Sequence, residues 1–89
     1  MKTIQLIIKG KVQGVFFRAT AKDIADDLGV KGWIRNLPDR NVEIRATATE
    51  EALQQFIDWC KQGPPKAKVE NVTVEEFVPE DFNSFKIIR

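Results

Sequence analysis

The chain has 89 residues, a net charge of +1, 43% hydrophobic residues and 30% charged residues. This length favours one domain, residues 1–89, and the balanced charge argues against a dedicated nucleic-acid binder, which normally shows a basic excess. The sequence has no histidine and no tyrosine, and its one cysteine is Cys60. These counts exclude a Ser-His-Asp triad, a Cys-His pair, an intrachain disulfide and a zinc site built on histidine.

No apolar run approaches the ~20 residues of a membrane span, and the N-terminus lacks the long apolar segment of a secretory signal. A single cysteine is typical of a reducing compartment. We therefore expect a cytoplasmic, monomeric protein with no membrane or nucleic-acid partner and with no metal or other cofactor. Any catalysis by such a chain must work by positioning and electrostatics.

The first predicted strand lies around residues 4–8, where apolar residues alternate with a period of two. Residues 10–15 are predicted to form a loop, in which Gly10 and Gly14 would permit a tight turn. Helical spacing of apolar and small residues begins at Phe17 and predicts a helix.

Gly29 is a predicted C-terminal stop for that helix. Residues 30–36 and 42–47 are predicted to form two strands of a hairpin, because both have strand-like patterns. The connection between them, residues 37–41, reads Leu-Pro-Asp-Arg-Asn and has the composition of a turn.

Thr49 is a predicted N-cap for a second helix, whose apolar stripe includes Cys60 as a packed small hydrophobic residue. Gly63 and the prolines after it end this helix. Strands are predicted within residues 69–78 and 85–88. The order β-α-β-β-α-β with a short extra strand predicts an α+β, ferredoxin-like sandwich with two helices on one face of a mainly antiparallel sheet of four to five strands.

Residues 10–18 read Gly-Lys-Val-Gln-Gly-Val-Phe-Phe-Arg and combine three features that bind anions. Glycines let the backbone bend sharply, the N–H groups of residues 13–17 can point inward as a nest, and Arg18 offers a bidentate fork. The stretch is not a Walker A loop, because no Gly-Lys-Ser/Thr follows. The side chains of Phe16 and Phe17 are expected in the core.

The same stretch resembles the first signature of the acylphosphatase family, Gly-x-Val-Gln-Gly-Val-x-Phe-Arg, at every specified position. Residues 32–36, Gly-Trp-Ile-Arg-Asn, resemble the Gly-aromatic-small-x-Asn motif of that family. The resemblance continues through Trp59, through the Gly-Pro pair at residues 63–64 and into residues 85–89. It therefore covers essentially the whole chain.

The resemblance implies an acylphosphatase that hydrolyses the carboxyl-phosphate bond of small acyl phosphates to a carboxylate and inorganic phosphate, without a metal. Arg18 would bind the phosphate together with the loop amides, and Asn36 would hold and orient the attacking water. Taken without the first motif, Asn36 is better explained as a strand-end or turn residue. The implied phosphate-binding residues are Gln13, Gly14, Val15, Phe16, Phe17 and Arg18.

Three positions depart from the family pattern. Arg40 occupies a place in the hairpin turn where glycine is usual, Ala48 lies where a glycine is common, and Ile34 is bulkier than the usual occupant of its position. We expect the turn to be rebuilt around Asn41, because asparagine tolerates the left-handed conformation. These departures affect the hairpin that carries Asn36 and leave the phosphate loop unchanged.

Two other classes of function fit parts of the sequence. RNA-recognition modules share this element order, and residues 31–34 begin like their basic-Gly-aromatic motif, but residues 36–38 replace the later exposed aromatics. A non-catalytic phosphate sensor, or a free-standing relative of the acylphosphatase-like domains of carbamoyl-transfer enzymes, would retain the phosphate loop. An RNA shift assay and a test of hydrolysis distinguish these classes.

Overall fold

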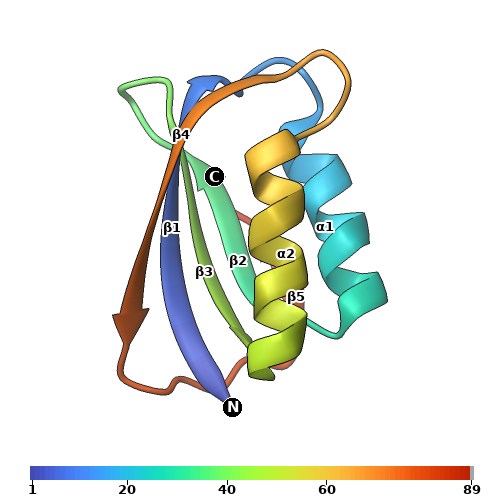
Figure 1. The fold of residues 1–89 in the computed structure, drawn as a ribbon, viewed down its shortest axis with the longest axis vertical. Helices are drawn as coiled ribbons and strands as arrows, with labels where there is room; N and C mark the ends of the chain where they lie inside the picture. The colour runs from blue at the N-terminus through green and yellow to red at the C-terminus, as the bar shows by residue number, and fades with distance from the viewer. Residues whose placement is uncertain (89) are drawn as a thin grey trace.

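The structure, a computed structural model, describes residues 1–88. The five strands form one sheet in the order β4-β1-β3-β2-β5, and both helices cover the same face of it (Figure 1). This arrangement confirms the predicted α+β, ferredoxin-like fold. The elements are β1 (Lys2–Lys11), α1 (Phe17–Leu28), β2 (Lys31–Asn36), β3 (Val42–Ala48), α2 (Glu50–Gln62), β4 (Lys68–Phe77) and β5 (Phe85–Ile87).

The directions of the strands decide where the site lies. Both β1 and β2 pair antiparallel with β3, so β1 and β2 run in the same direction. Their C-terminal residues, Lys11 and Asn36, therefore lie at the same edge of the sheet. The short β5 pairs parallel with β2 and brings Ile87 opposite Ile34. Because β1 and β2 run in the same direction, the loop after β1 and the hairpin after β2 are neighbours.

The core fills the space between the sheet and the two helices. Phe17, at the start of α1, is buried and packs on Trp59 of α2 with the ring centroids 5.3 Å apart. Phe56 of α2 packs edge-on against Phe85 of β5 at 5.8 Å. Burial of an aromatic side chain contributes about 1.5–3 kcal/mol. The contact between Phe17 and Trp59 holds the first turn of α1 in place, and that turn directly follows the loop of residues 12–16.

Both helices end and begin largely as predicted. Gly29 ends α1 in the left-handed conformation, with φ 76°. Thr49 caps α2 by accepting a hydrogen bond from the Ala52 N–H at 3.2 Å, which confirms the predicted N-cap. Cys60 is fully buried within the core, as predicted. No helix within residues 1–88 is long and apolar enough to cross a bilayer.

Gly10 lies in a different place from the one predicted. It belongs to β1 rather than to the loop, with φ 129°, and a Cβ atom there would overlap the backbone oxygen of Lys68. The register of β1 against β4 shifts between Lys9 and Gly10, so the glycine permits a close approach of β4 at a bulge. The turn that leads into α1 is therefore shorter than predicted and starts at Val12.

Candidate active site

The loop between β1 and α1 contains two left-handed residues. Gly14 and Phe16 have positive φ angles of 72° and 64°, whereas Val15 between them does not. Left-handed residues next to right-handed ones are how anion nests turn successive N–H groups toward one point, and the two left-handed residues of this loop suit such a nest. The conformation predicted for Gly14 is therefore present, and Phe16 adds a second left-handed residue.

The N–H groups of this loop are unpaired. Those of residues 13–18 donate to no acceptor within residues 1–88. Phe16 occupies the N-cap position of α1 and makes no side-chain capping bond, and the first turn of this helix has no acidic residue. The partial positive charge at the helix N-terminus is therefore not neutralised by the loop or by the first turn.

The side chains of the two adjacent phenylalanines diverge. Phe17 is buried, as predicted, but the ring of Phe16 is 74% exposed, so the prediction that it lies in the core was wrong. Phe16 holds the left-handed conformation at the N-cap of α1, outside the helix whose first residue, Phe17, enters the core. The carbonyl oxygen of Phe16 accepts hydrogen bonds from the N–H and the hydroxyl of Thr20, at 3.1 and 2.8 Å.

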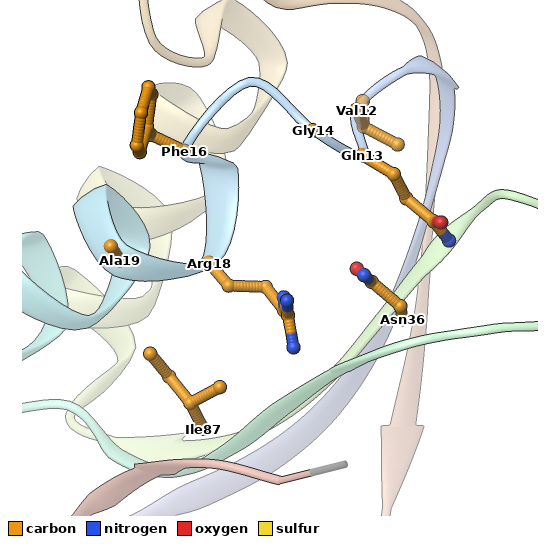
Figure 2. A pocket seen from close by; sticks show the side chains of 8 residues that line it. All are labelled: Val12, Gln13, Gly14, Phe16, Arg18, Ala19, Asn36 and Ile87. Carbon is orange, nitrogen blue, oxygen red and sulfur yellow. The ribbon is translucent and has the colours of Figure 1, made fainter.

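Arg18 extends from the first turn of α1 into the space enclosed by the loop. Figure 2 shows its guanidinium directed toward Asn36. The side chain is partly buried, and none of the ion pairs among residues 1–88 includes it. A permanently charged, planar fork in this position suits a phosphate group.

Asn36, the last residue of β2, points into the same space from the opposite side (Figure 2). Its Oδ1 atom is buried and has no hydrogen-bond partner within residues 1–88. A buried acceptor without a donor is unfavourable by about 1–3 kcal/mol. Oxygens of this kind in native proteins call for an explanation, and a water or a bound ligand is one.

The side chain of Gln13, one of the predicted phosphate-binding residues, binds the protein backbone. Its side chain points toward the β2–β3 hairpin (Figure 2). Its Nε2 donates to the carbonyl oxygens of Leu37 at 3.0 Å and Asn41 at 2.9 Å. Both protons of the amide are therefore used, and only the backbone N–H of Gln13 is available to a phosphate. The first motif specifies this glutamine, but no local pattern identifies its two acceptors.

The prediction that Asn41 takes the left-handed position of the hairpin turn is wrong, because Arg40 takes it. Arg40 has φ 74° and takes the left-handed position. The N–H and the side-chain amide of Asn41 both donate to the carboxylate of Asp39, each at 3.1 Å. Because these bonds fix Asn41, the residue before it makes the left-handed turn.

These elements enclose an open cavity of about 340 Å³. It brings together Arg18 and Asn36, the two predicted catalytic residues. The side chains of Val15 and Phe17 are buried in the core, so only their backbone can serve the predicted phosphate site. Within residues 1–88 no group of three His, Cys, Asp or Glu side chains is arranged to hold a metal ion. The cavity is lined by Val12, Gln13, Gly14, Phe16, Arg18, Ala19, Asn36 and Ile87.

Comparison with known proteins agrees with this geometry. The acylphosphatase family model matches residues 4–87. An acylphosphatase from Gloeobacter violaceus is 48% identical over 82 residues, which cover 92% of this chain and 88% of that protein. One from Thiobacillus denitrificans is 49% identical over 76 residues, 85% of each chain.

The fold comparison gives the same answer. The crystal structure of acylphosphatase from Bacillus subtilis superimposes with a TM-score of 0.97 at 38% identity, and the match covers 100% of both chains. The resemblance inferred from the two sequence motifs is thereby confirmed. By sequence and by fold, the chain belongs to the acylphosphatase family.

Proposed function

We propose that the protein hydrolyses the carboxyl-phosphate bond of small acyl phosphates, and that it does so without a metal ion or other cofactor. The observation that carries the proposal is the cavity in which unpaired loop amides and Arg18 face the unpaired Oδ1 of Asn36. Membership of the acylphosphatase family supports the same reaction.

The phosphoryl group binds to the loop. The N–H groups of residues 13–18 and the guanidinium of Arg18 take its oxygens, with the helix N-terminus behind them. In the loose transition state of phosphoryl transfer, negative charge spreads over the three equatorial oxygens. Donors already fixed around those oxygens stabilise that charge without reorganising, which is usually the largest contribution to catalysis.

The nucleophile is a water that donates a hydrogen bond to Oδ1 of Asn36. An amide oxygen is a weak base, so Asn36 contributes alignment of the water with phosphorus rather than removal of its proton. The bond from the water oxygen to phosphorus forms as the bond from phosphorus to the acyl oxygen breaks. A dianionic acyl phosphate and one water then give a carboxylate and dihydrogen phosphate, so both protons of the water remain on the phosphate.

The leaving group explains why such a site needs no general acid. A carboxylate is the conjugate base of an acid with a pKa of ~4, so it departs without a proton. A phosphate monoester expels an alkoxide or phenoxide, and it normally needs a general acid or a metal. The sequence has no histidine to supply that proton. We therefore expect selectivity for acyl phosphates over phosphate esters.

The test compares benzoyl phosphate with p-nitrophenyl phosphate in the presence of EDTA. We expect hydrolysis of the first alone. Arg18→Ala should lower kcat/KM by at least ~10²–10³, the usual loss for one electrostatic donor. Asn36→Ala should lower kcat severely and leave the inhibition constant of inorganic phosphate unchanged. Asn71→Ala, an exposed asparagine of β4, is the control and should behave like the parent.

Three outcomes would contradict parts of this proposal. Parent activity in Asn36→Ala would remove the role of this residue in orienting water. Loss of activity in EDTA, with recovery on adding Mg²⁺, would exclude the metal-free mechanism. Binding of inorganic phosphate without hydrolysis of either substrate would favour a phosphate sensor.

We further propose that residues 1–89 act as one monomeric, cytoplasmic domain with no nucleic-acid or membrane partner. Arg18 and Asn36 both line one cavity of the single domain, so the proposed reaction needs no residue from a second subunit. The family model spans residues 4–87, which supports one domain. The net charge of +1 supports the absence of a nucleic-acid partner, and the burial of the one cysteine fits a reducing compartment.

A further inference from the structure

We propose that Gln13 is a positioning residue that fixes Asn36 relative to the phosphate loop. The inference rests on the proposed function, because its consequence is the placement of the water that Asn36 holds. Two hydrogen bonds carry it, from Nε2 of Gln13 to the carbonyl oxygens of Leu37 and Asn41, at 3.0 and 2.9 Å. They join segments that lie 24 and 28 residues apart in the chain.

The two acceptors are the two ends of the hairpin turn. The N–H of Leu37 donates to the carbonyl of Asn41 at 2.9 Å, and the N–H of Arg40 donates to the carbonyl of Leu37 at 3.1 Å. Gln13 takes a remaining acceptor position on each of these carbonyls and completes a closed turn. Leu37 directly follows Asn36. The bond from Gln13 to the carbonyl of Leu37 therefore holds the backbone one residue from the side chain that is proposed to bind water.

Asn36 has few other constraints. Its backbone pairs with Val42 at the last position of the β2–β3 register. Its Oδ1 has no partner within residues 1–88. Within residues 1–88, the loop of residues 12–16 and the hairpin of residues 37–41 are joined by two side-chain hydrogen bonds, and Gln13 donates both. The position of Asn36 relative to the bound phosphate therefore depends on Gln13.

The consequence for kinetics is specific. The phosphate contacts proposed above use backbone N–H groups and Arg18, so they do not need the side chain of Gln13. Alignment of the water with phosphorus does need it, and a misplacement of about 1 Å in such geometry lowers rates by up to ~10². Loss of the Gln13 amide should therefore lower kcat and leave the binding of inorganic phosphate unchanged.

The experiment is a double-mutant cycle between Gln13→Met and Asn36→Ala, followed with benzoyl phosphate. Methionine has nearly the length of glutamine and no donor, so it removes the hydrogen bonds while it fills the space. We expect Gln13→Met to lower kcat by ~10–10² in the parent background, with an unchanged inhibition constant for inorganic phosphate. In the Asn36→Ala background the same change should cause no further loss, because the residue that it positions is absent.

The controls separate positioning from stability. Gln54→Met removes an exposed glutamine of α2 whose Nε2 binds Asp58 at 3.0 Å, and it should leave kcat unchanged. Urea unfolding and phosphate inhibition report folding for each variant. Gln13→Ala is a second variant in case methionine disturbs the loop, and it should show the same split between kcat and phosphate binding.

Three results would overturn the inference. The first is an unchanged kcat in Gln13→Met and Gln13→Ala. The second is an equal fold-loss in both backgrounds, and the third is a weakened inhibition by phosphate, since either of these two is the mark of a general structural role. Full activity in Asn36→Ala alone would instead contradict the proposed function. Failure of the inference and failure of the proposed function are thus distinguishable.

Discussion

Phe16, which lines the cavity, and Arg40, in the hairpin turn after β2, hold a backbone conformation that is unfavourable for their residue types. Their φ angles are 64° and 74°, and a left-handed residue with a Cβ atom costs roughly 1–2 kcal/mol. Strain of this kind persists where surrounding bonds impose it. Thr20 binds the carbonyl of Phe16, and the carboxylate of Asp39 binds Asn41 beside Arg40. The loop and the hairpin therefore both reach their shapes at a local cost.

The strain at Arg40 leads to a prediction about stability. Arg40→Gly should raise the free energy of unfolding by up to ~1 kcal/mol relative to Arg40→Ala, because glycine adopts φ 74° without steric strain. The alanine variant also loses the exposed side chain and keeps the Cβ atom, so the comparison isolates the backbone. Urea unfolding with equal m-values measures the difference. A glycine variant no more stable than the alanine variant would contradict this account.

The sequence predicts that Arg18 and Asn36 share a site, and both line one cavity, but the conformations of several residues around them could not be predicted. Arg18 and Asn36 lie where the two motifs indicated. The choice of Arg40 over Asn41 for the left-handed position depends on the carboxylate of Asp39. The target of Gln13 depends on a hairpin 24 residues away. Tertiary contacts of this kind leave no periodic or local signal in the chain.

The two helices differ in how their N-terminal N–H groups are satisfied. α2 begins with a Thr49 cap and two glutamates, which together satisfy its N-terminal amides and its dipole. These signals are local, so its start was predictable. α1 has neither a side-chain cap bond nor an acidic residue in its first turn. Phe17 at its start is buried in the core instead, and the N–H groups of its first two residues have no acceptor within residues 1–88.

Packing of α2 against the sheet should make stability depend on pH through Cys60. The thiol is fully buried, and burial raises its pKa above the ordinary value of 9.0. The unfolded chain therefore loses this proton near pH 9 while the folded chain keeps it, so the unfolded state binds fewer protons. Stability should fall above pH 9 by up to ~1.4 kcal/mol per pH unit and be unaffected by Cys60 below that pH.

Urea unfolding of the parent and of Cys60→Ala, at pH 8 and pH 10 with a reductant, measures this effect. The alanine variant loses packing at both pH values, but it should lack the extra decline that the thiol causes. Other groups titrate equally in both proteins and cancel in the comparison. An identical decline in the two proteins would show that Cys60 ionises as readily in the folded chain as in the unfolded one.

At the scale of the whole molecule, the sheet assembles the site from distant segments. β1 and β2 both run antiparallel to β3, so the loop after β1 and the hairpin after β2 meet at one edge (Figure 1). The short β5 adds Ile87 to the lining of the same cavity (Figure 2). The element order predicts the first of these relations. The bulge at Gly10 and the register of β5 follow from close packing with β4 and β2, which the pattern of apolar residues does not encode.

Because the site exists only in the folded chain, the bound product should stabilise the whole fold. The unpaired amides and Arg18 belong to the loop and first helical turn that the pairing of β1 and the burial of Phe17 hold in place, so the unfolded chain offers no equivalent site. Inorganic phosphate at a hundred times its dissociation constant should therefore raise the free energy of unfolding by ~2.7 kcal/mol. Urea unfolding in phosphate and in chloride at equal ionic strength measures this gain.

Two variants separate specific binding from the general stabilisation that phosphate gives by exclusion from protein surfaces. Arg18→Ala should retain only the general part, since it removes the charged fork that holds the anion. Asn36→Ala should retain the full gain, because water positioning takes no part in binding the product. Equal gains in the parent and in Arg18→Ala would mean that phosphate does not bind in this cavity. A gain lost in Asn36→Ala would make that residue a phosphate ligand rather than a holder of water.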